Sequence, residues 1–392
     1  MEAIRPEQAV AHEAGGYWRR RGLPTRPEQV VAAPGAETLL LALLAAATDT
    51  RGGLLLPRPC AAWHAAPARL LGRPVHCVPT PAECGGVPDP FALLETLRRA
   101  RRDGPGPRVL LLSVADDPTG TAVPPELLHE VCEAAAGEEL LILSDESWRD
   151  TSHRPHDTVT VSPAEMLHGP AGDADRVCVL NGLEAALLPD GPAAAVARLP
   201  DTARGKQLTA AVRRALDCLG TALVPATAER AAEALAEPQA ARRRRTAAAR
   251  AHGTAAAALR RTVVEAGGLC RPPHVGRHLY ADLEPLRPSL EQRGVEDAAT
   301  LEAALLLRLG NVALGGHHFG DDPGALRVRL STTYTAYAAN TANTPHDTPA
   351  GYGDGASGQT DVPGGLSAFL RDAETAPPLP IARTHHEHRR RA

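Results

Sequence analysis

The chain has 392 residues, and its 42 Lys or Arg and 46 Asp or Glu give a formal net charge of −4. This near-neutral charge argues against general binding to nucleic acid or to an anionic membrane surface. The longest apolar run, Leu39 to Ala47, has about half of the roughly 20 residues that a membrane span needs, which argues against a transmembrane segment.

Short apolar runs rich in Val, Leu and Ile alternate with helical patterns through the first half of the chain. Because these runs do not alternate with polar residues, they predict strands that are covered on both faces. The predicted strands are 29–33, 53–56, 75–78, 108–113, 140–144, 177–180 and 193–198, and helical composition lies between them at 38–48, 67–71 and 125–136. The pattern predicts an α/β domain with a mostly parallel seven-stranded sheet between helices.

The pattern changes after residue 200. Residues 208–266 are nearly all helix formers, with breaks near 220–225 and at Pro238. A strand at 280–283, a helix at 300–309 and a strand at 325–331 follow, which predicts a smaller α+β C-terminal domain. We therefore expect a short N-terminal segment (1–22), a large α/β domain (23–215), a small domain (216–338) and a disordered tail (339–392).

Cysteine and histidine spacing gives no sign of a metal site. The seven cysteines are scattered without a Cys-x-x-Cys pair, which favours reduced thiols over disulfides or zinc. His385, His386 and His388 lie in the predicted tail, and a disordered segment does not hold ligand geometry. The N-terminal residues contain no apolar signal region, so we expect a cytoplasmic protein.

Three turns combine polar residues with a strand end. Asp117 begins an Asp-Pro-Thr-Gly turn after one predicted strand, and Asp145 ends another. Ligands of open α/β sheets bind at the carboxyl ends of the strands. Gly35, Ala36 and Glu37 join a strand to a helix, and the free amides of such a helix start can hold a phosphate.

The order and spacing of these turns resemble the class I/II aminotransferases, which are pyridoxal-phosphate (PLP) enzymes of fold type I, over about residues 10–337. The resemblance implies that Gly35–Glu37 contact the cofactor phosphate, Asp117 the pyridine hydroxyl and Asp145 the pyridine nitrogen. Trp148 stands where the family has a tyrosine near the ring hydroxyl, and Arg329 matches the arginine that binds the substrate α-carboxylate. It also implies that the family's N-terminal arm is missing here or replaced by the first dozen residues.

The lysine motif of the family is where the resemblance fails. The family's Ser-x-Ser-Lys, whose lysine forms the Schiff base with PLP, aligns without a gap on Gly182, Leu183, Glu184 and Ala185, and the following arginine aligns on Ala193. Lys206 is the single lysine of the chain, 21 residues beyond Ala185, and we expect it to be exposed on a surface helix. Covalent anchoring of PLP at the family position is therefore excluded.

Three hypotheses follow for the function. The favoured one is a non-transaminating structural or regulatory paralogue, forming a homodimer or a heterodimer with a related aminotransferase. The second is an enzyme that acts on an amino acid with noncovalently held PLP or its amine form, in which Glu184 is a weak candidate base; we expect Glu184 to be a loop carboxylate facing water. The third is a protein that binds a small carboxylate through Arg329. No catalytic residue, metal, nucleic-acid partner or membrane partner is predicted.

Overall fold

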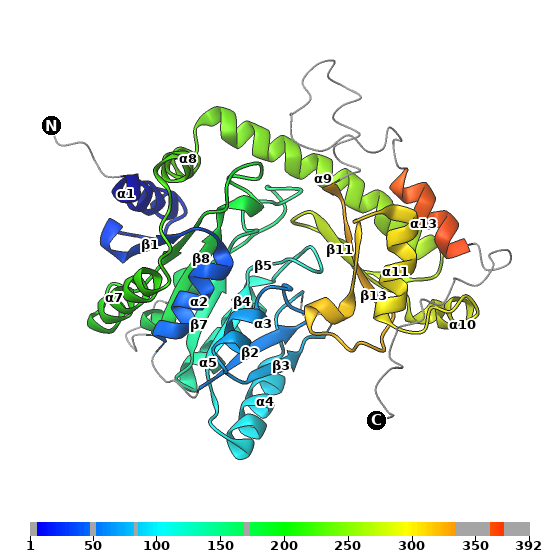
Figure 1. The fold of residues 1–392 in the computed structure, drawn as a ribbon, viewed down its shortest axis with the longest axis horizontal. Helices are drawn as coiled ribbons and strands as arrows, with labels where there is room; N and C mark the ends of the chain where they lie inside the picture. The colour runs from blue at the N-terminus through cyan, green and yellow to red at the C-terminus, as the bar shows by residue number, and fades with distance from the viewer. Residues whose placement is uncertain (1–5, 48–51, 82–84, 168–172, 334–360, 372–392) are drawn as a thin grey trace, which may run out of the picture.

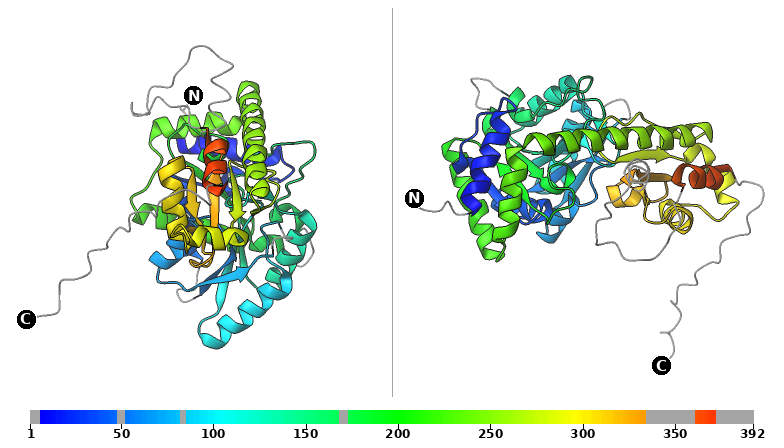
Figure 2. Two further views of the ribbon diagram at one scale, coloured as in Figure 1. Left: turned by 90° about the vertical axis from the view of Figure 1, so that its right-hand side faces the viewer. Right: turned by 90° about the horizontal axis from the view of Figure 1, so that it is seen from above.

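The computed structural model describes residues 6–47, 52–81, 85–167, 173–333 and 361–371. It consists of a larger unit built on a seven-stranded sheet and a smaller unit built on a four-stranded sheet (Figure 1). The long helix α9 (Gln239–Glu265) runs from one unit to the other (Figures 1 and 2). Within the described ranges no helix is long and apolar enough to cross a membrane.

The seven-stranded sheet contains every strand that the apolar runs predict. Its order is β1-β9-β8-β7-β4-β2-β3. The strands are parallel except for β9, which runs antiparallel to both β1 and β8. The strands are β1 (Val30–Ala33), β2 (Gly53–Arg58), β3 (Val75–Pro79), β4 (Pro107–Ser113), β7 (Leu141–Asp145), β8 (Val177–Gly182) and β9 (Ala195–Arg198). The predicted mostly parallel α/β fold is confirmed.

Both faces of this sheet are buried, because successive side chains of a strand point to opposite faces. In β4, Leu110 and Leu112 belong to one apolar core, and Val109 and Leu111 belong to the other. The first core is covered by α1 (Pro6–Arg19), α4 (Pro90–Asp103), α5 (Pro125–Gly137), α6 (Pro163–Met166) and α8 (Pro225–Ala236). The second is covered by α2 (Ala36–Ala46), α3 (Ala65–Leu70) and α7 (Ala203–Cys218).

Local sequence explains where several helices begin. The Asp89 side chain accepts hydrogen bonds from the backbone N–H of Phe91 and Ala92 and so caps α4, whose first residue is a proline. Asp297 caps α11 (Ala298–Leu309) in the same way through Thr300. These side chains satisfy amides that have no partner inside the helix.

The smaller unit is an antiparallel sheet of order β10-β11-β13-β12 with a core of its own. Its strands are β10 (Leu269–Cys270), β11 (His278–Asp282), β12 (Ala313–Gly315) and β13 (Arg327–Ser331). The C-terminal half of α9 packs on it together with α11, α10 (Arg287–Glu291) and α13 (Val362–Arg371). A two-stranded ribbon, β5 (Ala115–Asp116) with β6 (Thr121–Ala122), projects from the larger unit.

Two of the predicted boundaries differ from the packing. Helix α1, inside the predicted N-terminal segment, and helix α8, inside the predicted small domain, both pack in the core of the larger unit. They lie side by side there (Figure 2). Their apolar faces fit each other and the sheet, so the larger unit extends from α1 through α8, and α9 makes the connection.

The expectation of a disordered tail is wrong for residues 362–371. These residues form α13, which packs against α9 and α11. Val362, Leu366, Phe369 and Leu370 are buried in the small-unit core. Their spacing places them on one face of a helix, and this face gives the segment an apolar area to bury. The other predicted tail residues, including the three tail histidines, lie outside the described residues.

Candidate active site

The candidate site residues meet where the carboxyl ends of β4, β7 and β8 face the smaller unit. The structure brings Asp145, at the end of β7, beside the end of β8, since the Ser147 hydroxyl donates to Asp145 and accepts a hydrogen bond from the N–H of Gly182. His64 reaches the same place from the loop before α3, since its side chain contacts Asp145. The sheet therefore assembles side chains that are far apart in the sequence.

Asp145 is almost fully buried and both of its carboxylate oxygens have partners. Nε2 of His64 lies 2.9 Å from Oδ2. Oδ1 accepts hydrogen bonds from the Ser147 backbone N–H and hydroxyl, at 3.0 and 2.5 Å. The same hydroxyl oxygen accepts a hydrogen bond from the N–H of Gly182 at 2.8 Å. This network fixes the orientation of Asp145 and ties the end of β7 to the end of β8.

Asp117 is held by two basic side chains of the smaller unit. Arg329 on β13 donates from Nη1 to Oδ2 at 3.2 Å, and Nδ1 of His278 on β11 lies 2.6 Å from Oδ1. Burial raises the pKa of Asp117, but the charges of His278 and Arg329 outweigh it and lower the pKa to about 2. The arginine expected to bind a substrate carboxylate is thus paired with a carboxylate of the chain itself.

The turn after Asp117 requires glycine at position 120. Gly120 has φ of +66°, and a Cβ there would lie 2.2 Å from the carbonyl oxygen of His278. The Gly120 carbonyl accepts hydrogen bonds from the N–H groups of His274 and Val275. Only glycine combines this backbone conformation with so close an approach, so the turn docks on the segment that leads into β11.

Trp148 lies at the contact between the two units. Its ring meets His278 edge-on, with centroids 5.5 Å apart, and the guanidinium of Arg277 lies 5.8 Å from the ring centroid. Arg329 has a similar aromatic neighbour, since its guanidinium lies 4.9 Å from the ring centroid of Phe319. These contacts orient the basic side chains around Asp117.

The amino end of α2 is the predicted phosphate contact. Gly35 precedes the helix, Ala36 is its first residue, and Glu37 is exposed in the first turn. A Cβ placed at Gly35 would lie 3.6 Å from the Cβ of Ala193, and one at Gly182 would lie 3.1 Å from the Cβ of Ala36. The segments around 182 and 193 therefore both lie against the start of this helix.

Glu184 is half-buried, whereas the sequence led us to expect a loop carboxylate that faces water. Its Oε2 is buried and has no hydrogen-bond partner among the described residues. Burial raises the pKa of Glu184, the charge of Asp145 raises it further, and the backbone N–H groups of Ala36 and Ala194 oppose the shift. The segment that carries Glu184 lies against the amino end of α2, where the free amides and the helix dipole oppose the effect of burial on this carboxyl group.

His64, His278 and Asp116 belong to this site although the sequence did not single them out. A histidine after a tryptophan, or at the start of a strand, carries no spacing signal, and only the fold brings these two to the carboxylates. Asp116 is buried beside Thr119, whose hydroxyl and N–H both donate to its Oδ2. Burial raises the pKa of Asp116 to about 7; Thr119 opposes the shift and the charge of Asp117 adds to it.

This shift predicts a pH dependence of stability. Folded Asp116 holds its proton more tightly than unfolded Asp116, so its contribution to the free energy of unfolding falls as pH rises from about 4 to about 7. Asp116→Asn removes this titration, and its stability relative to the parent chain should be greater at pH 8 than at pH 4. Urea denaturation at the two pH values measures the difference, and an equal difference at both would contradict the assignment.

Comparison with known proteins gives this arrangement a family. Residues 5–341 match the family described as aminotransferase class I and II. The chain belongs to this family. The probable aspartate/prephenate aminotransferase of Thermus aquaticus is 28% identical over 175 residues, which cover 42% of this chain and 43% of that protein. The aspartate/prephenate aminotransferase of Thermus thermophilus is 26% identical over 166 residues, which cover 40% and 42%. The matched segments span less than half of the length of these relatives.

Solved aminotransferase structures have the same fold over most of the chain. A variant of Thermus thermophilus aspartate aminotransferase in complex with tryptophan superposes with a TM-score of 0.71 at 21% identity, covering 94% of this chain and 83% of that one. The aromatic aminotransferase of Pyrococcus horikoshii gives 0.70 at 16% identity, covering 94% and 87%. The predicted aminotransferase fold type I is confirmed.

In this aminotransferase-family chain, a lysine anchor for PLP could come only from the one lysine in the sequence. Lys206, its single lysine, lies on α7 with a side chain that is 72% exposed, and its Nζ lies 3.6 Å from Asp201. The exposure of Lys206 agrees with the expectation from the sequence. Against the start of α2, Ala193 offers no positive charge and Glu184 brings a negative one. The side chains at positions 184, 185 and 193 themselves therefore provide neither a covalent anchor nor a cation for a phosphate.

Proposed function

We propose that the chain is a non-transaminating member of the class I/II aminotransferase family, acting as a structural or regulatory subunit in a homodimer or in a heterodimer with an active relative. The observation that carries the proposal is that the segment with Glu184 and Ala185 lies against the amino end of α2, since a Cβ at Gly182 would lie 3.1 Å from the Cβ of Ala36. In this proposal the chain places an acidic side chain, in place of a lysine and a hydroxyl, in the segment that the family resemblance assigns to the cofactor phosphate.

Electrostatics supports this assignment. An anion at a helix amino end is stabilised by the helix dipole and by amides without intrahelical partners. An ionised Glu184 in the adjoining segment would bring a half-buried like charge close to a phosphate bound there. The replacement thus favours the chain without cofactor over the chain with cofactor.

The chemistry of the lysine supports it as well. A lysine in this position of the family removes the α-proton of the substrate and returns it to the cofactor carbon. Ala185 is the residue that aligns there, and a methyl group transfers no proton. The hydrogen bonds between Ser147 and Asp145 fix this part of the site. Under this proposal neither residue transfers a proton.

One observation favours the second candidate, an enzyme that holds PLP noncovalently. The raised pKa of Glu184 makes this carboxylate a better proton acceptor than an ordinary glutamate. In a protonated state it would also repel a phosphate less. This candidate requires retained cofactor and turnover, and both are measurable.

The test is a PLP-binding experiment on the full chain. After incubation with PLP and gel filtration, we expect neither retained cofactor absorbance nor a borohydride-fixed adduct. We also expect no transamination of aspartate and prephenate, the substrates named for the Thermus relatives. Retained PLP together with amino-acid turnover would overturn the proposal.

The variant Glu184→Gln separates the two candidates. It removes the like charge, so under the proposal the affinity for PLP rises by about tenfold or more while activity stays absent. Under the second candidate it abolishes turnover. Glu126→Gln is the matched control, because Glu126 lies exposed in the first turn of another helix, α5, and its replacement should change neither quantity.

A further inference from the structure

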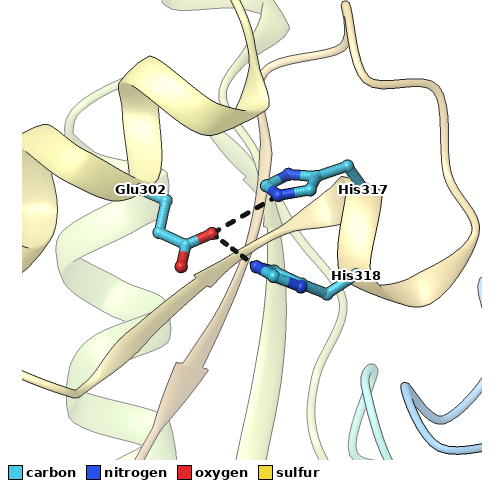
Figure 3. A group of neighbouring side chains, drawn as sticks. All are labelled: Glu302, His317 and His318. Atoms are coloured by element: carbon cyan, nitrogen blue, oxygen red, sulfur yellow. Dashed lines mark hydrogen bonds and ion pairs between the residues drawn. The ribbon is translucent and has the colours of Figure 1, made fainter. Parts of the chain in front are cut away.

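Three side chains of the smaller unit form a cluster outside the candidate active site. Glu302 comes from α11, and His317 and His318 come from the short helix Gly316–Phe319 that follows β12. One ligand atom from each lies within 4.8 Å of the other two. Figure 3 shows both imidazole rings directed at the Glu302 carboxylate.

The distances are those that a small tetrahedral cation requires. Oε2 of Glu302 lies 2.9 Å from Nε2 of His318 and 3.8 Å from Nε2 of His317. Ligand atoms about 2.0–2.1 Å from a tetrahedral zinc ion lie about 3.3 Å apart, between these two distances. A cation could therefore enter the cluster with only small rotations of the side chains.

The surrounding backbone holds two of the ligands in place. The Gly315 N–H donates to the same Oε2 of Glu302 at 2.9 Å. A Cβ at position 315 would lie 2.7 Å from Nδ1 of His317 and 2.6 Å from the carbonyl oxygen of Ala298, so glycine makes room for the imidazole. Nδ1 of His317 is buried without a hydrogen-bond partner among the described residues, which leaves Nε2 as the polar contact of this ring.

We propose that Glu302, His317 and His318 bind a divalent transition metal, zinc in particular, through two imidazole nitrogens and one carboxylate oxygen. This ligand set suits zinc, and three protein ligands leave a fourth position for water or another exchangeable ligand. The proposal is independent of the proposed function.

The short helix also connects the cluster to the candidate active site. The short helix that carries both histidines ends at Phe319, whose ring lies under the guanidinium of Arg329. The Phe319 carbonyl accepts a hydrogen bond from the N–H of Cys60 in the larger unit at 3.1 Å. Metal binding would thus stabilise a segment that contacts both units.

The experiment is zinc titration by calorimetry with the reduced full chain. Because His385, His386 and His388 could bind metal by themselves, these three are first replaced by Ala, and this triple variant is the parent. We expect it to bind one zinc ion per chain and to unfold at a higher temperature when zinc is present.

Single replacements in the parent identify the ligands. Glu302→Gln, His317→Ala and His318→Ala should each weaken zinc binding by about 100-fold or more, since even partners of the ligands contribute about 10–100-fold. The Gln amide oxygen can still accept from the Gly315 N–H, so Glu302→Gln should fold normally. His129→Ala is the control, because His129 pairs with Glu133 at 3.3 Å without a second histidine.

Several outcomes would overturn the proposal. They are a parent that binds no zinc, ligand variants that bind it as tightly as the parent, and a cobalt-substituted parent whose spectrum shows thiolate charge-transfer bands. A cobalt spectrum with nitrogen and oxygen ligation that is lost in Glu302→Gln would support it.

Discussion

The combined variant Glu184→Ser/Ala185→Lys/Ala193→Arg is expected to bind PLP covalently, whereas the unaltered chain is not. These changes restore the family residues at three positions, of which 184 and 193 lie at the amino end of α2. Removing a like charge and adding a guanidinium each change phosphate binding by about 1.5 kcal/mol or more, so affinity should rise by about 100-fold or more. Absorbance before and after borohydride, with mass spectrometry of the reduced adduct, measures the result.

Two control variants show which change is responsible. Glu184→Ser/Ala193→Arg without the lysine should bind PLP that gel filtration removes more slowly, but should form no adduct. In the complete variant, moving the lysine from position 185 to 186 should abolish the adduct, because neighbouring residues direct their side chains differently. An adduct of equal yield at both positions would contradict the alignment. Turnover is not expected, since Asp117 and Trp148 also differ from the family pattern.

Among the replacements proposed for this chain, Glu237→Gln is expected to lower the free energy of unfolding the most. Glu237 directly follows α8, its side chain is 4% exposed, and it contacts Arg20 at 3.1 Å and Arg21 and Arg245 at 2.8 Å. These contacts join α1, α8 and α9. Removing one partner of a buried ion pair costs about 3–5 kcal/mol, because the remaining charges stay buried. Urea denaturation monitored by circular dichroism measures the loss.

Glu95→Gln is the matched control for this experiment. Glu95 also lies near three arginines, Arg98, Arg99 and Arg102, but its side chain is 41% exposed on α4. Solvent and salt screen exposed ion pairs, so this replacement should have little effect on stability. Equal losses for the two variants would show that burial is not what makes the Glu237 cluster important.

The contribution of Glu237 to the free energy of unfolding should also depend on pH. Burial raises its pKa, but Arg21 and Arg245 outweigh burial and lower the pKa from 4.5 to about 2. Its contribution to stability is therefore present above about pH 4.5 and is lost as pH falls toward 2. The difference in stability between the unaltered chain and Glu237→Gln should become smaller as pH falls over this range. A constant difference would argue against an ionised pair.

Much of the larger unit was predictable because its strands are covered on both faces. Such strands are short continuous apolar runs, as in Val109 to Leu112 of β4, and each predicted run became a strand of the sheet. The limits of the units were less predictable. Whether α8 packs on the larger or the smaller core depends on the shape of its partner surface, which no local pattern encodes.

The sequence of α13 contains a helical pattern of apolar residues that the composition of the surrounding segment obscured. Its buried residues Val362, Leu366, Phe369 and Leu370 follow the spacing of one helix face. The surrounding segment is rich in Gly, Thr, Pro and Asp, and this composition suggested disorder. A short apolar face among polar residues becomes stable only when a complementary surface is available, here from α9 and α11.

The sequence by itself determined which groups are present: one lysine, at 206, and alanine at 185, with Asp117, Asp145 and Arg329 in the order of the aminotransferase family. Only the tertiary structure decided what these groups contact. It pairs Arg329 with Asp117 and brings the segment that contains Glu184 against the start of α2. The physical reason is that the state of a charge depends on its burial and its neighbours, and the fold brings those neighbours from distant parts of the chain.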